Sequence, residues 1–130
     1  ISIVKAAKDQ ILKNVGVAYI DLNGLKAIND NYGHSNGDKL ICTAADTFKM
    51  VFPDNSYRIG GDEFVIIEQN IERDKYEERI TALKNIMQDK QVSISIGVLW
   101  REQVDDLEAL LKAADKLMYM EKEMYHKNRE

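Results

Sequence analysis

The hydrophobic residues of the chain recur with two different periods, which change from one segment to the next. Three segments repeat apolar residues every three or four positions, which predicts helices with one buried face. These stripes consist of Leu40, Ile41, Ala44, Ala45 and Phe48, of Tyr76, Ile80, Leu83 and Met87, and of Leu107, Leu110, Leu111, Ala114, Leu117 and Met118. Elsewhere, Val92, Ile94 and Ile96 alternate with polar residues, which predicts a strand with one buried face.

Together these patterns predict nine elements. The predicted helices cover residues 2–14, 25–31, 36–51, 72–88 and 105–125, and the predicted strands cover residues 16–21, 56–60, 63–68 and 92–98. The prediction of the first helix depends on the helical spacing of apolar residues between Ile3 and Leu12. We therefore expect an α/β (α+β) fold in which helices flank a mixed sheet.

Composition limits the class of protein. With 130 residues, of which 45% are hydrophobic, the chain is expected to be one globular domain. The net charge of −4 argues against a broad nucleic-acid surface but is compatible with a mononucleotide ligand. We expect a cytoplasmic domain, because no signal peptide or apolar run of membrane-spanning length is visible and the single cysteine fits a reducing compartment. That residue, Cys42, is expected to be a small core residue.

Two acidic residues follow a glycine pair between two β-prone runs. Gly60 and Gly61 separate the run 57–59 from the run 64–67, which predicts a tight hairpin whose turn needs positive φ. Asp62 and Glu63 then lie at the tip of the hairpin. Adjacent carboxylates repel each other, so this arrangement favours a divalent cation nearby.

A further acidic residue, Asp21, ends the predicted strand 16–21. Asn23 and Gly24 follow, and a short predicted helix begins at Leu25. Ligands of α/β sheets bind at such strand ends, and the free N–H groups of a helix start can hold phosphate. The sequence therefore predicts that Asp21 and Asp62 share Mg²⁺, and that the backbone of residues 23–25 binds a polyphosphate.

Several motifs occur together in the order seen in one known family. They are Asp-Leu-Asn-Gly-Leu-Lys-Ala-Ile-Asn-Asp at 21–30, Tyr-Gly-His at 32–34, Gly-Asp at 37–38, Arg-Ile-Gly-Gly-Asp-Glu-Phe at 58–64, Ser-Ile-Ser-Ile-Gly-Val at 93–98 and Ala-Asp-Lys-Leu-Met-Tyr at 114–119. Over about residues 17–122 the chain resembles the GGDEF domain of diguanylate cyclases. This family condenses two GTP into cyclic di-GMP and releases two pyrophosphates. The resemblance implies a nucleotidyl-cyclase or polymerase-palm-like arrangement with a largely antiparallel central sheet.

The resemblance also implies catalytic and metal-binding roles. Asp21, Asp62 and Glu63 would be the catalytic acids, and together with the carbonyl of Leu22 they would hold Mg²⁺ or Mn²⁺. Such ions neutralise the charge that develops during attack on an α-phosphate. From the residues alone, the alternative is that Asp62 and Glu63 are solvated turn acids and that Asp21 is an acid that favours the following helix start.

Asn29 and Asp38 match the positions that read guanine in the family. A carboxylate accepts hydrogen bonds from N1–H and the 2-amino group of guanine, and adenine lacks this pair of donors. We expect selection of GTP over ATP. Each residue alone has an ordinary alternative role, Asp38 as an acid in a first helical turn and Asn29 as a polar residue near a helix end.

By resemblance, the phosphate site consists of Asn23, Gly24, Leu25, Lys26, Lys122 and His126. Asn23 replaces an acid that many members carry, so it is expected to be a secondary ligand or none. The basic end of the chain departs from the family because a glycine is missing, so the second phosphate cation can be His126, Lys127 or Arg129. Arg58 is interpreted equally as a structural residue or as a cation beside the site.

Two departures bear on regulation. Many members carry an Arg-x-x-Asp product-inhibition motif, but here Val51 replaces the arginine while Asp54 is retained. A valine cannot make the bidentate contact, so this inhibition site is expected to be absent. The family's upstream Asp-x-Leu-Thr stretch is also absent, so we expect residues 1–130 to be a single domain excised from a longer regulatory protein. Whether that longer protein is anchored to a membrane stays open.

The leading hypothesis is a diguanylate cyclase domain with GTP as substrate and cyclic di-GMP as product. Because one site holds one GTP, catalysis is expected to need a homodimer, although the isolated domain can be monomeric and weakly active. No nucleic-acid partner is expected. The alternative is a non-catalytic regulatory module that binds GTP or cyclic di-GMP, and the intact Gly-Gly-Asp-Glu-Phe motif at 60–64 counts against it.

Overall fold

The computed structural model describes residues 2–128, in which four strands form one sheet of order β2-β3-β1-β4. The strands are β1 (Leu12–Leu22), β2 (Ser56–Arg58), β3 (Glu63–Glu68) and β4 (Ile94–Val104). All three strand pairings are antiparallel. The expected α/β class with a largely antiparallel sheet is therefore confirmed.

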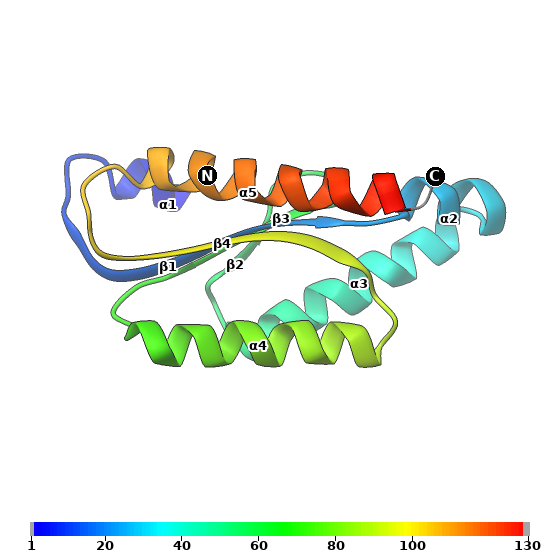
Figure 1. Cartoon of the computed structure of the whole chain (residues 1–130), viewed down its shortest axis with the longest axis horizontal. Helices are drawn as coiled ribbons and strands as arrows, with labels where there is room; N and C mark the ends of the chain where they lie inside the picture. Colours follow the sequence, from blue (N-terminus) through cyan, green and yellow to red (C-terminus); the bar gives the residue numbers. More distant parts are fainter. Residues whose placement is uncertain (1, 129–130) are drawn as a thin grey trace.

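Helices cover both faces of this sheet. They are α1 (Ser2–Ala6), α2 (Leu25–Tyr32), α3 (His34–Val51), α4 (Arg73–Asp89) and α5 (Leu107–Asn128). Helices α1 and α5 lie on one face, α3 and α4 lie on the other, and α2 lies beside the C-terminal end of α5 (Figure 1). None of the helices in the described part is both long enough and apolar enough to span a bilayer.

Strand β1 contributes to two separate cores because its side chains alternate between the two faces. Ala18, Ile20 and Leu22 pack with α3 and α4. Val15 and Val17 instead belong to the core beneath α1 and α5. Since Asp21 has the same parity as Val15 and Val17, its side chain lies on the α5 face of the sheet. This alternation decides which helix completes the candidate site.

The prediction of a helix over residues 2–14 is wrong. Helix α1 ends at Ala6, and β1 begins at Leu12, where the sequence pattern indicated a helix. The reason is pairing across the sheet, because Leu12 lies opposite Val104 and Val15 lies opposite Arg101. The same pairing extends β4 six residues beyond its predicted end at residue 98.

The link between β2 and β3 differs from the predicted tight turn. It runs from Ile59 to Asp62, and neither Gly60 nor Gly61 has positive φ. Instead the guanidinium of Arg58 donates hydrogen bonds to the carbonyl oxygens of Gly60 at 3.1 Å and Gly61 at 2.9 Å. A four-residue link does not need the mirror-image turn of a two-residue hairpin. Arg58 therefore has a structural role.

Two further details concern α3 and α5. Cys42 on α3 is exposed, so the expectation that it packs in the core is wrong. Helix α5 approaches β4 so closely that a Cβ on Gly97 would lie 1.9 Å from the carbonyl oxygen of Ala114. The amide of Ile96 also donates to the carboxylate of Glu121 at 3.3 Å. These two contacts fix the position of α5 on the sheet.

Candidate active site

Three carboxylates converge at one end of the sheet. Since β1 and β3 are antiparallel, the end of β1 lies beside the start of β3, and Asp21 lies directly opposite Glu63. The amide of Leu22 donates to the carbonyl oxygen of Asp62 at 2.9 Å, which holds the hairpin link against the end of β1. One carboxylate oxygen from each of Asp21, Asp62 and Glu63 lies within 4.8 Å of the others.

Asp21 is the most buried member of this acidic trio, with 5% of its surface exposed. Its Oδ2 forms an ion pair with the ammonium group of Lys122. Its Oδ1 is buried and has no hydrogen-bond partner within the described chain. Burial raises the pKa of Asp21 to about 6 and Asp62 adds to the rise, while the hydrogen bond from Lys122 opposes it.

Glu63 is oriented by a neighbour on β1. The hydroxyl of Tyr19 donates to Oε2 of Glu63 at 3.1 Å. Burial raises the pKa of the Tyr19 phenol, and the nearby Glu63 charge raises it further. The phenol therefore keeps its proton at neutral pH and remains a donor. The sequence did not predict this role of Tyr19, because a tyrosine within an apolar strand is typical of a core side chain.

The acidic trio fits a divalent cation. Three carboxylates so close together repel one another, and Mg²⁺ and Mn²⁺ favour oxygen ligands. The unpartnered Oδ1 of Asp21 supplies an acceptor that no protein group satisfies among the described residues. Leu22, which follows Asp21, is also buried. The prediction that its carbonyl is a ligand stays a prediction.

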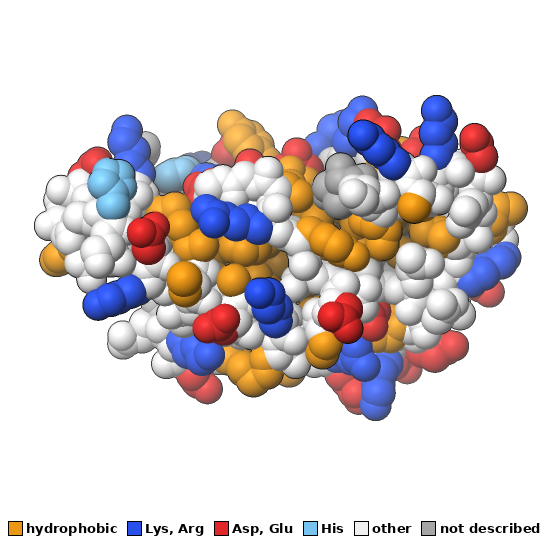
Figure 2. Space-filling view, turned by 180° about the vertical axis from the view of Figure 1, so that it is seen from behind, with side chains coloured by type: hydrophobic (Ala, Val, Ile, Leu, Met, Phe, Trp, Pro, Cys, Tyr) orange, Lys and Arg blue, Asp and Glu red, His pale blue; other side chains and the backbone are white. Residues whose placement is uncertain are grey.

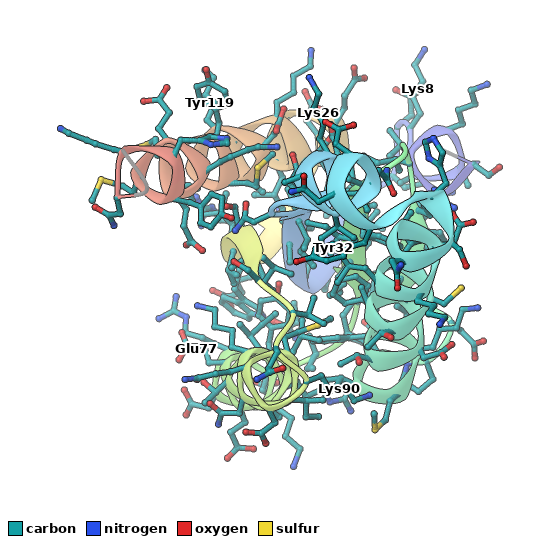
Figure 3. The ribbon with its side chains drawn as sticks, turned by 90° about the vertical axis from the view of Figure 1, so that its right-hand side faces the viewer. Lys8, Lys26, Tyr32, Glu77, Lys90 and Tyr119 are labelled. Carbon is teal, nitrogen blue, oxygen red and sulfur yellow. The ribbon has the colours of Figure 1, made fainter. Side chains whose placement is uncertain are left out.

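Asp62 also borders a cleft of about 390 Å³ between α2 and the end of α5. The lining of this cleft consists of Leu22, Gly24, Leu25, Lys26, Ala27, Asp30, Asp62, Lys122, Tyr125 and His126. Figure 3 looks at this end of the molecule, where Lys26 extends from α2 on the side away from α4. The cleft thus brings together five of the six residues predicted for the phosphate site.

Gly24 forms the start of α2. It adopts a left-handed conformation with φ of 75°, and no side chain caps the helix there. The first N–H groups of a helix have no partners within it, so those that follow Gly24 are available to an anion in the cleft. Glycine is favoured here because residues with a Cβ resist this φ.

Asn23, the sixth predicted phosphate residue, has a different place. Its amide side chain donates to Ser93 at 3.0 Å and accepts from Ser95 at 2.9 Å. Its backbone N–H donates to the carbonyl of Ser93 at 2.9 Å. Asn23 thus ties the end of β1 to β4. The two serines belong to the motif at 93–98, but the sequence indicated no role for them, because a fully buried Ser95 looks like any polar residue of an alternating strand.

The predicted guanine pair lies on neighbouring helices. Asn29 on α2 packs against Gly37 of α3 so closely that a Cβ on Gly37 would lie 1.7 Å from its Oδ1. This Oδ1 is buried without a partner in the described structure. Asp38 follows Gly37 and is exposed. Neither Asn29 nor Asp38 belongs to the lining of the 390 Å³ cleft, so any contact with a base involves the surface of α2 and α3 beside it.

The other predicted basic and regulatory residues lie around this centre. His126 borders the cleft and packs edge-on against Tyr125, Lys127 is exposed, and Arg129 lies outside the described residues. At the predicted product-inhibition position, Val51 ends α3 and packs against the core, whereas Asp54 is exposed.

Comparison with known proteins agrees with this geometry. Residues 3–128 match the family model described as diguanylate cyclase, GGDEF domain. Signaling protein YkoW of Bacillus subtilis is 39% identical over 124 residues, covering 85% of this chain and 15% of YkoW. Diguanylate cyclase DgcS of Shewanella oneidensis is 34% identical over 116 residues, covering 84% of this chain and 39% of DgcS. The chain thus spans well under half the length of these relatives.

Solved structures give the same result. The GGDEF domain of PA1120 (TpbB or YfiN) from Pseudomonas aeruginosa superposes with a TM-score of 0.74 at 27% identity, covering 86% of this chain and 73% of that one. A sensory box/GGDEF family protein from Caulobacter crescentus gives a TM-score of 0.70 at 29% identity, covering 86% and 80%. Sequence motifs, fold and relatives agree, and the chain belongs to the GGDEF domain family of diguanylate cyclases.

Proposed function

We propose that this chain is a catalytic domain that condenses two GTP molecules into cyclic di-GMP and releases two pyrophosphates. The observation that carries the proposal is the acidic trio Asp21, Asp62 and Glu63, whose oxygens lie within 4.8 Å of one another. Asp62 also borders a cleft that contains Lys26 and Lys122. Nucleotidyl transfer needs this arrangement, in which acidic residues hold cations next to a basic cleft that binds the phosphates.

The acidic trio would hold Mg²⁺ or Mn²⁺, which when bound neutralises charge on the phosphates and makes the attacking hydroxyl more acidic. The residues of the chain bind and orient the substrate. The N–H groups after Gly24 and the ammonium of Lys26 would bind the phosphates from the α2 side of the cleft. Lys122 and His126 would bind them from α5, and Tyr19 would keep Glu63 in place through its hydrogen bond.

Asn29 and Asp38 would select guanine. The buried Oδ1 of Asn29 has no partner within residues 2–128 and packs against Gly37, so it would be the amide Nδ2 of Asn29 that donates a hydrogen bond to a guanine acceptor. The exposed carboxylate of Asp38 can accept from N1–H and the 2-amino group. Because adenine lacks this pair of donors and leaves the Asp38 carboxylate unpaired, GTP is the expected substrate.

Product formation needs two such sites. Residues 2–128 of one chain carry one acidic trio, and cyclic di-GMP contains two phosphodiester bonds made between two nucleotides. Two copies of the domain would therefore face each other across the pair of GTP molecules. The packed Val51 at the position of the inhibitory arginine supports weak or absent product feedback at that site.

The test measures pyrophosphate and cyclic di-GMP formed from GTP or ATP with Mg²⁺ by the wild type and by Asp62→Ala. We expect product from GTP only, and a loss on the order of 100- to 1,000-fold in Asp62→Ala. Glu77→Ala is the matched control, because this acid lies on α4, away from α2 and the end of α5 (Figure 3). It should retain wild-type activity.

Binding without turnover in a dimeric protein would instead support a non-catalytic GTP-binding module. This outcome is recognised by thermal unfolding, because a ligand at about 100 times its dissociation constant stabilises a protein by about 2.7 kcal/mol. Stabilisation by GTP together with no pyrophosphate release would refute the proposed activity. No stabilisation by GTP or by cyclic di-GMP would refute both functions.

A further inference from the structure

We infer that Lys122 makes cation binding at the acidic trio depend on the nucleotide, because its ammonium group and a divalent cation compete for Asp21. In this inference, which depends on the proposed function, Lys122 is the counterion of Asp21 until a triphosphate attracts it into the cleft. Lys122 would then be a coupling residue in addition to a phosphate ligand.

The competition follows from where the ion pair lies. Lys122 contacts Oδ2 of Asp21, the most buried carboxylate of the acidic trio. Only 7% of the Asp21 side chain and 25% of the Lys122 side chain are exposed, so water and salt screen this pair poorly. A divalent cation on Asp21 would therefore meet a positive charge within one hydrogen bond of its ligand, which opposes its binding.

The cleft offers Lys122 another partner. Lys122 is part of the cleft lining together with Lys26 and His126, and the residues 24–27 at the start of α2 line the same cleft. A triphosphate in the cleft attracts the flexible ammonium group of Lys122, whose four-carbon stem can turn while its backbone stays fixed. Helix α5 itself is held on β4 by the contacts of Gly97 and Glu121, so the exchange requires only side-chain motion.

Exchange of partners produces positive coupling between the two ligands. The triphosphate withdraws Lys122 from Asp21 and the cation then replaces it there. Linkage requires that the cation strengthens nucleotide binding by the same factor. Without the lysine, the two ligands should behave in opposite ways: the cation alone should bind more tightly, and the metal-free nucleotide should bind more weakly.

The experiment compares wild type, Lys122→Gln and Lys116→Gln, the last of which removes the same charge from an exposed position of α5. Mn²⁺ binding without nucleotide is measured by electron paramagnetic resonance. Binding of a GTP analogue with a methylene group between the α- and β-phosphorus atoms is measured by calorimetry in a chelator. In Lys122→Gln we expect Mn²⁺ to bind about tenfold more tightly and the analogue about tenfold more weakly, within the usual range of coupling. Lys116→Gln should match the wild type in both.

Equal or weaker Mn²⁺ binding by folded Lys122→Gln, with normal binding of both ligands by the wild type, overturns this inference alone. A wild type that binds neither Mn²⁺ nor the analogue overturns the proposed function as well. If Lys122→Gln does not fold, the ammonium resonance of Lys122 is followed by NMR in the wild type. Saturating Mg²⁺ should move it to the position of exposed lysines, and an unchanged resonance refutes the competition.

Discussion

The ionised carboxylate of Asp21 destabilises the fold that holds it. Burial raises its pKa from 3.8 to about 6, so the folded state binds the proton more tightly than the unfolded state. The contribution of Asp21 to stability is therefore fully present below about pH 4 and is lost as the pH rises through 6. A difference of about 2 pKa units corresponds to roughly 3 kcal/mol. A residue retained at this cost is typical of a functional site.

Asp21→Asn should therefore stabilise the domain at pH 7.5 by on the order of 1 to 3 kcal/mol, because the raised pKa of Asp21 already includes the opposing effect of Lys122. The gain should shrink to nothing near pH 4, where the wild-type carboxylate is protonated. Urea unfolding at both pH values, without divalent cations, measures this difference, and Glu77→Gln on the exposed surface serves as the control. A less stable Asp21→Asn at pH 7.5 would show that the ion pair outweighs the effect of burial.

Individual site residues were predictable from the sequence to different degrees. Asp21 and Asp62 were predicted to converge because each ends or begins a strand at a turn, and the structure brings their oxygens together. Tyr19 and Ser95 were not predicted, because each acts on a residue more than forty positions away. A hydrogen bond across strands has no local pattern, since it depends on the register of the sheet.

At the scale of elements, Arg58 shapes the hairpin link that carries Asp62. Its guanidinium donates to two carbonyl groups in the link, those of Gly60 and Gly61. We expect Arg58→Ala to lower cyclase activity about tenfold, because the link loses both bonds, while stability falls by only about 1 kcal/mol. Arg101→Ala is the control, because the guanidinium of this exposed arginine donates to the carbonyl oxygen of its neighbour Trp100, and Arg101 lies opposite Val15, away from the Asp21 end of β1. Unchanged activity in Arg58→Ala would refute the role of these two hydrogen bonds in positioning Asp62.

Substitutions at two glycines, Gly97 and Gly61, should distinguish the effect of α5 packing from the effect of access to the site. A Cβ on Gly97 would lie 1.9 Å from backbone of α5, so Gly97→Ala should destabilise the domain by about 1 to 3 kcal/mol. A Cβ on Gly61 would meet nothing within 4 Å, and its φ is not positive. Gly61→Ala should thus change stability by less than about 0.5 kcal/mol.

The Gly61→Ala substitution, which should leave stability unchanged, should instead affect nucleotide binding. Gly61 lies next to Asp62 in the hairpin link, and a methyl group added there would occupy open space that a nucleotide bound near Asp62 would have to share. We expect Gly61→Ala to weaken binding of the GTP analogue in calorimetry, although the fold is unaffected. Wild-type affinity in Gly61→Ala would mean that the nucleotide stays away from this loop. Unchanged unfolding of Gly97→Ala would mean that α5 can move off β4 at little cost.

The elements that were mispredicted share one cause. The apolar residues of 3–12 have a helical period, yet Leu12 lies in a strand opposite Val104. The residues just before Val104 are polar and do not indicate a strand. The start of β1 and the end of β4, which pair with each other, were therefore both missed. The helices α4 and α5, whose stripes are regular, were predicted well because helical burial is encoded within one segment.

At the scale of the whole molecule, the antiparallel sheet collects the site from three distant parts of the chain. Residues 21–26, 62–63 and 122–126 meet at one end of the sheet, where α5 returns beside α2 (Figure 1). The space-filling view from behind shows basic and acidic side chains intermixed with hydrophobic ones, with no extended surface of one charge (Figure 2). Near the acidic trio, the basic groups placed to meet a nucleotide are Lys26, Lys122 and His126, which line the cleft.

A single site per chain sets the concentration dependence of the proposed reaction. If two copies must meet to join two nucleotides, the rate per mole of protein should rise in proportion to protein concentration below the dimerisation constant and level off above it. The measurement is cyclic di-GMP formation at saturating GTP over a range of protein concentrations, with the oligomeric state followed by analytical ultracentrifugation. Mixing wild type with an excess of Asp62→Ala should yield linear dinucleotide, because only one of the two bonds can then form. A rate per mole that stays constant while the protein is monomeric would contradict catalysis by a dimer.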